Sequence, residues 1–128
     1  MADFAKAHAK TGAHEKGWVN HPNDKGGETW AGITRRNHPL WAGWIIVDQA
    51  KTGLHVGPGA VKSAVLDQAL ANNPAVSKLT AGFYRAYYWN PLNLDREPSQ
   101  AIAEKAFDIA VNMGVGAAKK MLAEARAT

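Results

Sequence analysis

Apolar residues recur at helical spacing through the second half of the chain, and this periodicity predicts four helices between residues 61 and 125. The apolar positions that define them are Val61, Val65, Leu66 and Leu70 in the first, Val76, Leu79, Phe83 and Tyr87 in the second, Ile102, Ala106, Ile109 and Met113 with Phe107 and Ala110 beside them in the third, and Val115, Ala118, Leu122 and Ala125 in the fourth. The helices are separated by Asn72-Asn73-Pro74, Asn90-Pro91 and Gly114. Ser99 is expected to cap the third helix.

The first half of the chain has a different pattern. Asp3 is expected to cap a further helix that runs to about His14. Short aromatic and β-branched runs over residues 18–34 predict a small hairpin, with its turn at residues 23–27 and its second strand over residues 29–33. Glycine and proline interrupt residues 35–60, where the segment 41–51 suits a helix. The whole pattern predicts one mostly helical α+β domain over residues 1–128, with one small β-hairpin near the N-terminus.

Composition limits the chemistry that is open to this domain. The 128 residues are 46% hydrophobic and 20% charged, which is typical of a globular protein that buries a core without disulfides. Cysteine is absent, so the chain has no disulfide, no thiolate metal ligand and no cysteine nucleophile. The five histidines lack zinc-binding spacing, and we expect neither a metal nor another cofactor.

The chain carries an excess of positive charge. A formal net charge of +4 and a sequence pI of about 9.5 favour a polyanionic partner, such as nucleic acid, a membrane surface or an anionic cell wall. No stretch is long and apolar enough for a transmembrane helix, so no membrane insertion is expected. The N-terminus lacks the apolar core of a signal peptide, so action outside the cytoplasm would depend on another route of delivery.

Three polar residues around the predicted hairpin suit the cleavage of a glycosidic bond. Glu15 ends the first helix, Asp24 lies in the hairpin turn, and Thr29 lies on the returning strand. Such hydrolysis needs one protonated carboxyl as proton donor and a second group that supports the sugar cation or orients water. The helix C-terminus and the nearby Trp18 and Trp30 are expected to raise the pKa of Glu15, whereas Asp24 should stay ionised. Spacing alone leaves open that all three are ordinary surface, turn and strand residues.

The run from residue 15 to residue 34, EKGWVNHPNDKGGETWAGIT, resembles the signature of glycoside hydrolase family 108. That signature begins with a glutamate, two glycines and an aromatic residue, and continues through Val-Asn, Pro, Asn-Asp, Gly-Gly, Thr and Gly-Ile. The segments 84–92 (YRAYYWNPL) and 106–114 (AFDIAVNMG) are also similar to the family. A match of about twenty positions is far more specific than a lone short motif.

The resemblance implies a lysozyme-like N-acetylmuramidase that cleaves the β-1,4 bond between N-acetylmuramic acid and N-acetylglucosamine in peptidoglycan. It places Glu15 on the catalytic glutamate of the family. The order of Glu15, Asp24 and Thr29 is also similar to the triad of phage-type lysozymes, which implies that Asp24 and Thr29 serve the attacking water and that hydrolysis inverts the anomeric centre. The family occurs in phages and bacteria. Without a signal peptide, delivery is expected through a holin, a secretion apparatus or fusion to a secreted protein.

Three features depart from the family pattern. Lys16 replaces the glycine that usually follows the glutamate, and an inward-pointing cation there would lower the pKa of Glu15. Residues 38–75 are longer and richer in glycine than expected, which predicts an extra lobe or lid over the cleft. Family members often continue into a C-terminal wall-binding region that this sequence, which stops at Thr128, does not include, so we expect either a catalytic fragment or dependence on a fused partner.

Four further residues are candidates for substrate binding. Trp30, Tyr88 and Trp89 are candidates for stacking on sugar rings, although aromatic residues at helical spacing are also typical of a core. Asn112 fits a helix end beside Gly114 and is also a candidate to line the cleft.

The expected protein is therefore a monomer that binds peptidoglycan glycan strands, with an immunity protein that plugs its cleft as a further partner and no role for nucleic acid. Three alternatives stay open. The fold could be a wall-binding module without turnover, the basic chain could bind nucleic acid, or the enzyme could cleave chitin or chitosan. The nucleic-acid alternative leaves the carboxylates and the hairpin run unexplained.

Overall fold

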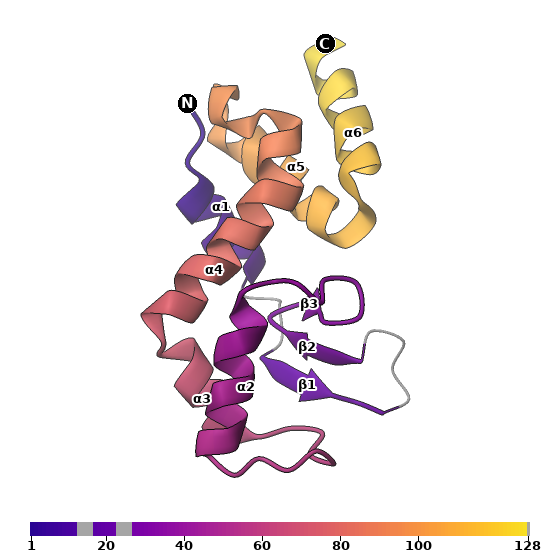
Figure 1. The fold of residues 1–128 in the computed structure, drawn as a ribbon. Helices are drawn as coiled ribbons and strands as arrows, with labels where there is room; N and C mark the ends of the chain where they lie inside the picture. Colours follow the sequence, from indigo (N-terminus) through magenta and orange to yellow (C-terminus); the bar gives the residue numbers. More distant parts are fainter. Residues whose placement is uncertain (13–16, 23–26, 128) are drawn as a thin grey trace. The chain divides into compact units, whose positions relative to one another are not determined.

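Helices form most of the chain, and a small antiparallel sheet forms near its N-terminus (Figure 1). The computed structural model describes residues 1–12, 17–22 and 27–127. Its elements are the helices α1 (Phe4–Gly12), α2 (Gly43–Gly53), α3 (Ala64–Ala71), α4 (Pro74–Tyr84), α5 (Gln100–Met113) and α6 (Val115–Ala127), and the strands β1 (Trp18–Asn20), β2 (Glu28–Trp30) and β3 (Ile33–Thr34). A π-helical turn (Arg85–Trp89) and two 3-10 turns (Asn90–Leu92 and Leu94–Arg96) lead from α4 to α5. The predicted mostly helical α+β fold is confirmed.

The chain divides into two compact units. Unit 1 consists of Met1–His14 and Ala81–Thr128, and so contains α1, α5, α6 and the end of α4. Unit 2 consists of Glu15–Thr80, and so contains the sheet, α2, α3 and the start of α4. None of the helices in the described parts of the chain combines the length and the apolar character needed to cross a membrane.

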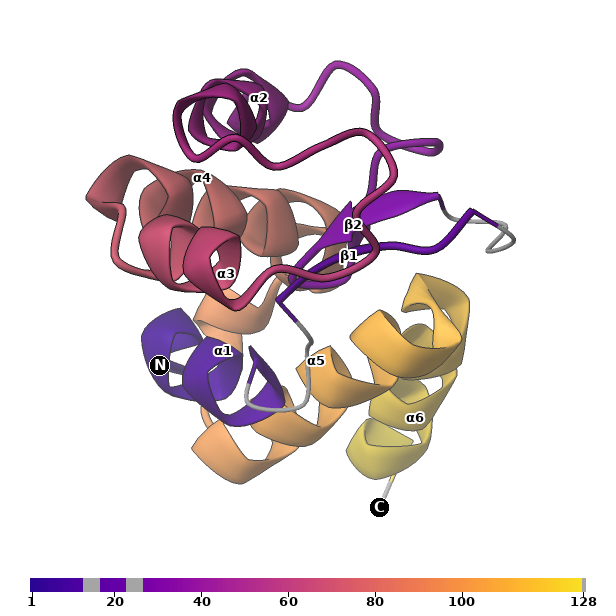
Figure 2. The ribbon, with the colours of Figure 1, turned by 90° about the horizontal axis from the view of Figure 1, so that it is seen from below.

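In unit 1, α5 packs against both α1 and α6 (Figure 2). Phe107 on α5 is fully buried, and its ring makes edge contacts with Phe4 and Trp89, with ring centroids 5.6 and 5.9 Å apart. The remaining buried residues of α5 are Ala103, Ala106 and Ala110. Aromatic rings from three segments of the chain therefore form the core of this unit, and α5 supplies the alanines beside them.

The apolar face predicted for α5 is confirmed at Ala106, Phe107 and Ala110 and is wrong at its larger aliphatic residues. Met113 is 73% exposed, and Ile102 and Ile109 are only half-buried. The buried stripe runs through the alanines instead, because helices approach most closely where the side chains between them are small. The larger aliphatic residues lie at the margins of the contact.

Most helix ends agree with the polar signals in the sequence. Ser99 Oγ accepts a hydrogen bond from the Ile102 amide (3.2 Å), which confirms Ser99 as the cap of α5. Asp3 Oδ1 accepts one from the Lys6 amide (3.3 Å) ahead of α1. At Gly114, which ends α5, φ is 100°, a conformation that residues with a side chain rarely adopt.

In unit 2, the three strands form an antiparallel meander in the order β1, β2, β3. The predicted single returning strand over residues 29–33 is wrong, because β2 ends at Trp30 and the chain turns before β3. Ala31 and Gly32 make this turn with φ angles of 48° and 84°, both in the left-handed region. Apart from Gly27, the predicted hairpin turn lies outside the described residues.

The outer edge of β1 is paired with the segment before α3. The Asn20 amide donates to the Val61 carbonyl (2.8 Å), and Val19 forms an antiparallel bridge with Lys62. This pairing explains why the helix predicted from Val61 starts three residues later, after Ser63, whose hydroxyl caps α3. The free edge of a strand is thereby covered.

The helix predicted over residues 41–51 is confirmed as α2, displaced by two residues. It lies beside α3 (Figure 1). Trp44 and Val47 on α2, and Leu66 and Leu70 on α3, are buried. The two helices thus supply much of the core of unit 2.

Candidate functional site

The two faces of the small sheet have different surroundings. One face is buried and carries Trp18, Trp30 and Ile33. Thr29 lies on the opposite face, between Val19 of β1 and Thr34 of β3, and all three residues are half-buried. Since neighbouring residues of a strand point to opposite faces, Thr29 is turned away from this core.

Trp30 belongs to the interior of unit 2. It is 7% exposed, and its Nε1 donates to Thr80 Oγ1 (3.2 Å). The Thr80 hydroxyl in turn donates to the Val76 carbonyl (2.7 Å) within α4. Of the two roles considered for Trp30, sugar stacking and core packing, the structure shows core packing.

Glu15 and Asp24, the carboxylates predicted to act with Thr29, lie outside the described residues. The described residues that follow Glu15 and Asp24 show where the two segments enter the sheet. The chain enters β1 through Gly17, two residues after Glu15, and enters β2 through Gly27, three residues after Asp24.

The entry to β1 is held by Asp67, an acidic residue on α3. The Trp18 amide donates a short hydrogen bond to Asp67 Oδ1. A Cβ atom on Gly17 would lie 2.5 Å from the same oxygen, so glycine is the residue that fits there. Asp67 therefore anchors the backbone shortly after Glu15. This contact was not predictable from the local sequence pattern, because it joins residues 49 positions apart.

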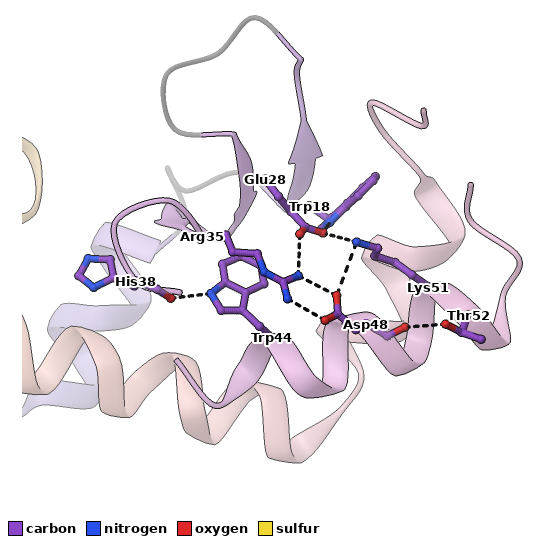
Figure 3. Close-up of polar contacts among 8 residues, drawn as sticks. All are labelled: Trp18, Glu28, Arg35, His38, Trp44, Asp48, Lys51 and Thr52. Carbon is purple, nitrogen blue, oxygen red and sulfur yellow. Dashed lines mark hydrogen bonds and ion pairs between the residues drawn. The ribbon is translucent and has the colours of Figure 1, made fainter. Parts of the chain in front are cut away.

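Four charged side chains, Glu28, Arg35, Asp48 and Lys51, join the sheet to α2 and form what we call the ionic cluster (Figure 3). Glu28 Oε1 accepts from Arg35 (2.9 Å), and Glu28 Oε2 accepts from Lys51 Nζ and from Trp18 Nε1 (both 2.8 Å). Arg35 also forms a bidentate pair with Asp48, with both N–O distances at 2.7 Å. Every oxygen of Glu28 thus has at least one donor.

Two tryptophans support the cations of the ionic cluster. The Arg35 guanidinium lies 5.2 Å from the ring centroid of Trp44, and Lys51 Nζ lies 5.9 Å from that of Trp18. Both rings are almost completely buried. Cation–π attraction adds to the ion pairs and keeps both cations beside the core.

The surroundings of the ionic cluster favour the ionised form of its carboxylates. Burial alone would raise the pKa of Glu28, but hydrogen bonds from Lys51, Trp18 and Arg35 outweigh burial and hold this pKa below its ordinary value. Hydrogen bonds from Arg35 lower the pKa of Asp48 in the same way. A carboxylate with a lowered pKa is a poor proton donor near neutral pH. The ionic cluster is therefore suited to fastening β2 to α2 and not to acid catalysis.

Tyr88 and Trp89, the other candidates for sugar stacking, belong to unit 1. Trp89 is fully buried against Phe107, and its Nε1 donates to Asp95 Oδ1 (2.8 Å). Tyr88 is half-buried, and its ring centroid lies 5.7 Å from that of Tyr84. Of the two rings, only that of Tyr88 presents a surface in this structure.

Asn112 lies near the end of α5 and is exposed. Its Nδ2 donates to the carbonyl (2.9 Å) and to Oδ1 (3.2 Å) of Asp108, and Thr11 Oγ1 donates to the same Oδ1 (3.3 Å). Asp108 and Thr11 line an open pocket of about 380 Å³ between α1 and α5, together with Lys10 and Glu104. The Asn112 amide is thus held at the side of a polar pocket.

Within the described ranges, no group of three or more histidine, aspartate or glutamate side chains could hold a metal ion.

Comparison with known proteins decides the family. The family model described as glycosyl hydrolase 108 matches residues 8–114. The chain belongs to glycosyl hydrolase family 108. The resemblance seen in the sequence is thereby confirmed, and membership indicates a glycoside hydrolase of the lysozyme-like, peptidoglycan-cleaving kind that acts on a cell wall. No curated protein and no solved structure gave a significant match.

The family 108 match spans every residue predicted to take part in catalysis or substrate binding: Glu15, Asp24, Thr29, Trp30, Tyr88, Trp89 and Asn112. Their individual roles are not decided by membership. Asp67 and the ionic cluster also lie within the matched range, although neither was predicted from the sequence.

Proposed function

We propose that this family 108 protein is an N-acetylmuramidase that hydrolyses the β-1,4 bond between N-acetylmuramic acid and N-acetylglucosamine. Glu15 acts as the general acid and protonates the leaving oxygen. Asp24 and Thr29 position the attacking water, and Asp24 offsets the positive charge that develops on the sugar. The observation that carries the proposal is the family match, which spans all three residues.

The state of the neighbouring carboxylates supports Glu15 as the acid. The described carboxylates of unit 2 are those of Glu28, Asp48 and Asp67. Glu28 and Asp48 have lowered pKa values, and Asp67 accepts the Trp18 amide. Carboxylates with lowered pKa values, such as those of Glu28 and Asp48, are poor proton donors. This favours an acid outside the ionic cluster, and the family resemblance puts Glu15 on the catalytic glutamate.

The location of Thr29 supports its role beside water. It lies in the middle strand of the sheet, on the face opposite the core, and it is half-buried. A hydroxyl on such a face can both donate a hydrogen bond to water and accept one from it. Its flanking strands restrain the backbone on both sides, which suits a group that must orient a water molecule.

For substrate binding, we propose contacts from Tyr88 and Asn112 and supporting roles for Trp30 and Trp89. Tyr88 presents part of its ring, and Asn112 is exposed beside a polar pocket. Trp30 and Trp89 are buried and hydrogen-bonded through Nε1, which suits residues that shape the core beneath a site.

Acting on the wall requires delivery, which we propose occurs through a holin or a dedicated secretion apparatus. Peptidoglycan glycan strands are the proposed partner of a monomeric enzyme, and an immunity protein is the proposed antagonist wherever the producing cell has to protect its own wall.

The proposal is tested by digesting purified sacculi and identifying the new reducing ends. A muramidase releases fragments that end in N-acetylmuramic acid. Fragments that end in N-acetylglucosamine would contradict the proposed bond, and cleavage of chitin in place of sacculi would contradict the substrate. Binding to sacculi without release of fragments would make the protein a wall-binding module of the same fold.

A further inference from the structure

A lysine lies in register with Thr29 on the sheet face turned away from the core. Val19 pairs with Thr29 on one side and bridges to Lys62 on the other, and Thr29 pairs with Thr34. Residues directly opposite each other on antiparallel strands place their side chains on the same face. Lys62, Val19, Thr29 and Thr34 therefore form one row across the sheet, which we call the threonine row.

Lys62 is close enough to Thr29 to contact the same ligand. Neighbouring strands are about 4.8 Å apart, so the backbones of Lys62 and Thr29, with β1 between them, are separated by roughly 10 Å. The lysine side chain is exposed and flexible, and its ammonium group can approach a ligand from any side. A glycan bound over Thr29 would therefore lie within reach of Lys62.

The charge of Lys62 is not neutralised by the described part of unit 2. The carboxylates there are engaged elsewhere, Glu28 and Asp48 within the ionic cluster and Asp67 with the Trp18 amide. Among the described residues, Lys62 forms no ion pair. An exposed lysine that pairs with none of the described carboxylates is suited to bind an anionic group of a ligand.

We propose that Lys62 binds a carboxylate of the glycan over the threonine row, and so favours acidic, muramic acid-containing strands over neutral, chitin-like strands. The inference rests on the proposed function and adds the charge of the substrate to it. Two groups of peptidoglycan offer this carboxylate: the lactyl group of N-acetylmuramic acid, where it carries no peptide, and the peptide stem.

Binding measurements on three glycans test the proposal. Denuded glycan strands carry the carboxylate on the lactyl group only, the same strands after methyl esterification carry none, and intact sacculi carry it on the peptide stem. Lys62→Gln removes the cation, Lys62→Arg keeps it, and Lys78→Gln makes the same charge change at an exposed lysine on α4. Binding is measured in the cold to limit turnover, and cleavage is followed separately.

We expect Lys62→Gln to weaken binding to denuded strands about two- to fivefold, as for one exposed ion pair, and to leave binding to esterified strands unchanged. Lys62→Arg and Lys78→Gln should bind as the wild type does. A loss seen with intact sacculi alone would identify the peptide stem as the source of the carboxylate.

Equal binding by Lys62→Gln and the wild type to both denuded strands and intact sacculi would overturn the proposal. An equal loss of binding to charged and to esterified strands would also overturn it. Lys62-dependent binding by a protein that cleaves none of the glycans would contradict the proposed function and leave the role of Lys62 standing. A wild-type protein that binds none of them would contradict both.

Discussion

Gly17 and Asp67 together define the start of β1. The Asp67 carboxylate occupies the space that a side chain on residue 17 would need, and it accepts the amide of Trp18. A partly buried amide that loses its acceptor costs more than the hydrogen bond itself contributes. These two residues therefore restrain the backbone shortly after Glu15.

Replacing Asp67 should loosen this backbone. We expect Asp67→Ala to lower the free energy of unfolding by about 1–2 kcal/mol, because the Trp18 amide is left without an acceptor. Asp67→Asn keeps a side-chain oxygen and should lose less. Urea denaturation measures both variants, and an Asp67→Ala protein as stable as the wild type would show that the contact contributes nothing.

Gly17→Ala tests the same contact from the other side. A methyl group there would meet the Asp67 carboxylate, so we expect a loss of about 1–3 kcal/mol in the wild type and a smaller loss in the Asp67→Ala background. A double-mutant cycle measures the difference. Strictly additive losses would mean that the two residues do not interact.

The role of a single residue was predictable from the sequence where that residue acts on neighbours a few positions away. Ser99 is recognised as a cap because a cap acts on amides a few positions away. Asp67 acts across 49 positions, and Glu28 meets partners on β1 and α2, so nothing in the local pattern distinguishes them from surface carboxylates. The roles of Glu15, Asp24 and Thr29 stay predictions that rest on the family signature.

Among the elements, the link between β2 and α2 depends on charge. Its centre is Glu28, whose side chain is 10% exposed and which accepts from one arginine, one lysine and one indole. An ionised carboxylate with such donors is stabilised in the folded state relative to the unfolded chain. The ionic cluster is therefore a source of pH-dependent stability.

Acid should weaken this link in a defined pH range. The folded-state pKa values of Glu28 and Asp48 lie below their ordinary values, so their contribution is fully present above about pH 4.5 and is lost as the pH falls through the lowered values. We expect Glu28→Gln to be less stable than the wild type at pH 6 and to lose less stability as the pH falls below about 4.5.

Thermal denaturation at several pH values measures this difference. Glu124→Gln, at an exposed position on α6, serves as the matched control and should follow the wild-type curve. Parallel curves for Glu28→Gln and the wild type would contradict the role given to the ionic cluster.

Element boundaries were predictable where a residue type forces them. Proline and asparagine mark the junction of α3 and α4, and glycine ends α5. The third strand was missed because its turn places Ala31 at a positive φ, which its residue type does not suggest. The buried face of α5 was predicted correctly at Ala106, Phe107 and Ala110, but not at its larger aliphatic residues, because small alanines take the buried positions beside Phe107.

At the scale of the whole molecule, the sequence signature identifies the family, because its match spans 20 consecutive residues and two later segments, and the family model confirms it over residues 8–114. The division into two compact units was not predicted, since hydrophobic periodicity reports on each element and not on which elements pack together.

The positive charge of the molecule should speed its encounter with an anionic wall. With a formal net charge of +4, we expect the rate of sacculus clearing to fall as ionic strength rises from about 0.05 to 0.5 M, because screening shortens the range of these charges about threefold. Turbidity measurements follow the rate. A rate independent of salt would mean that the net charge has no part in wall binding.

The central claim is that Glu15 is the proton donor of a peptidoglycan hydrolase. Its most direct test compares the cleavage of sacculi by the wild type, by Glu15→Gln and by Glu124→Gln. We expect Glu15→Gln to lose at least about a hundredfold in rate while keeping its fold and its binding to sacculi, because an amide cannot donate the proton that the leaving oxygen needs. Glu124→Gln should cleave as the wild type does. Undiminished cleavage by Glu15→Gln would show that another residue is the acid.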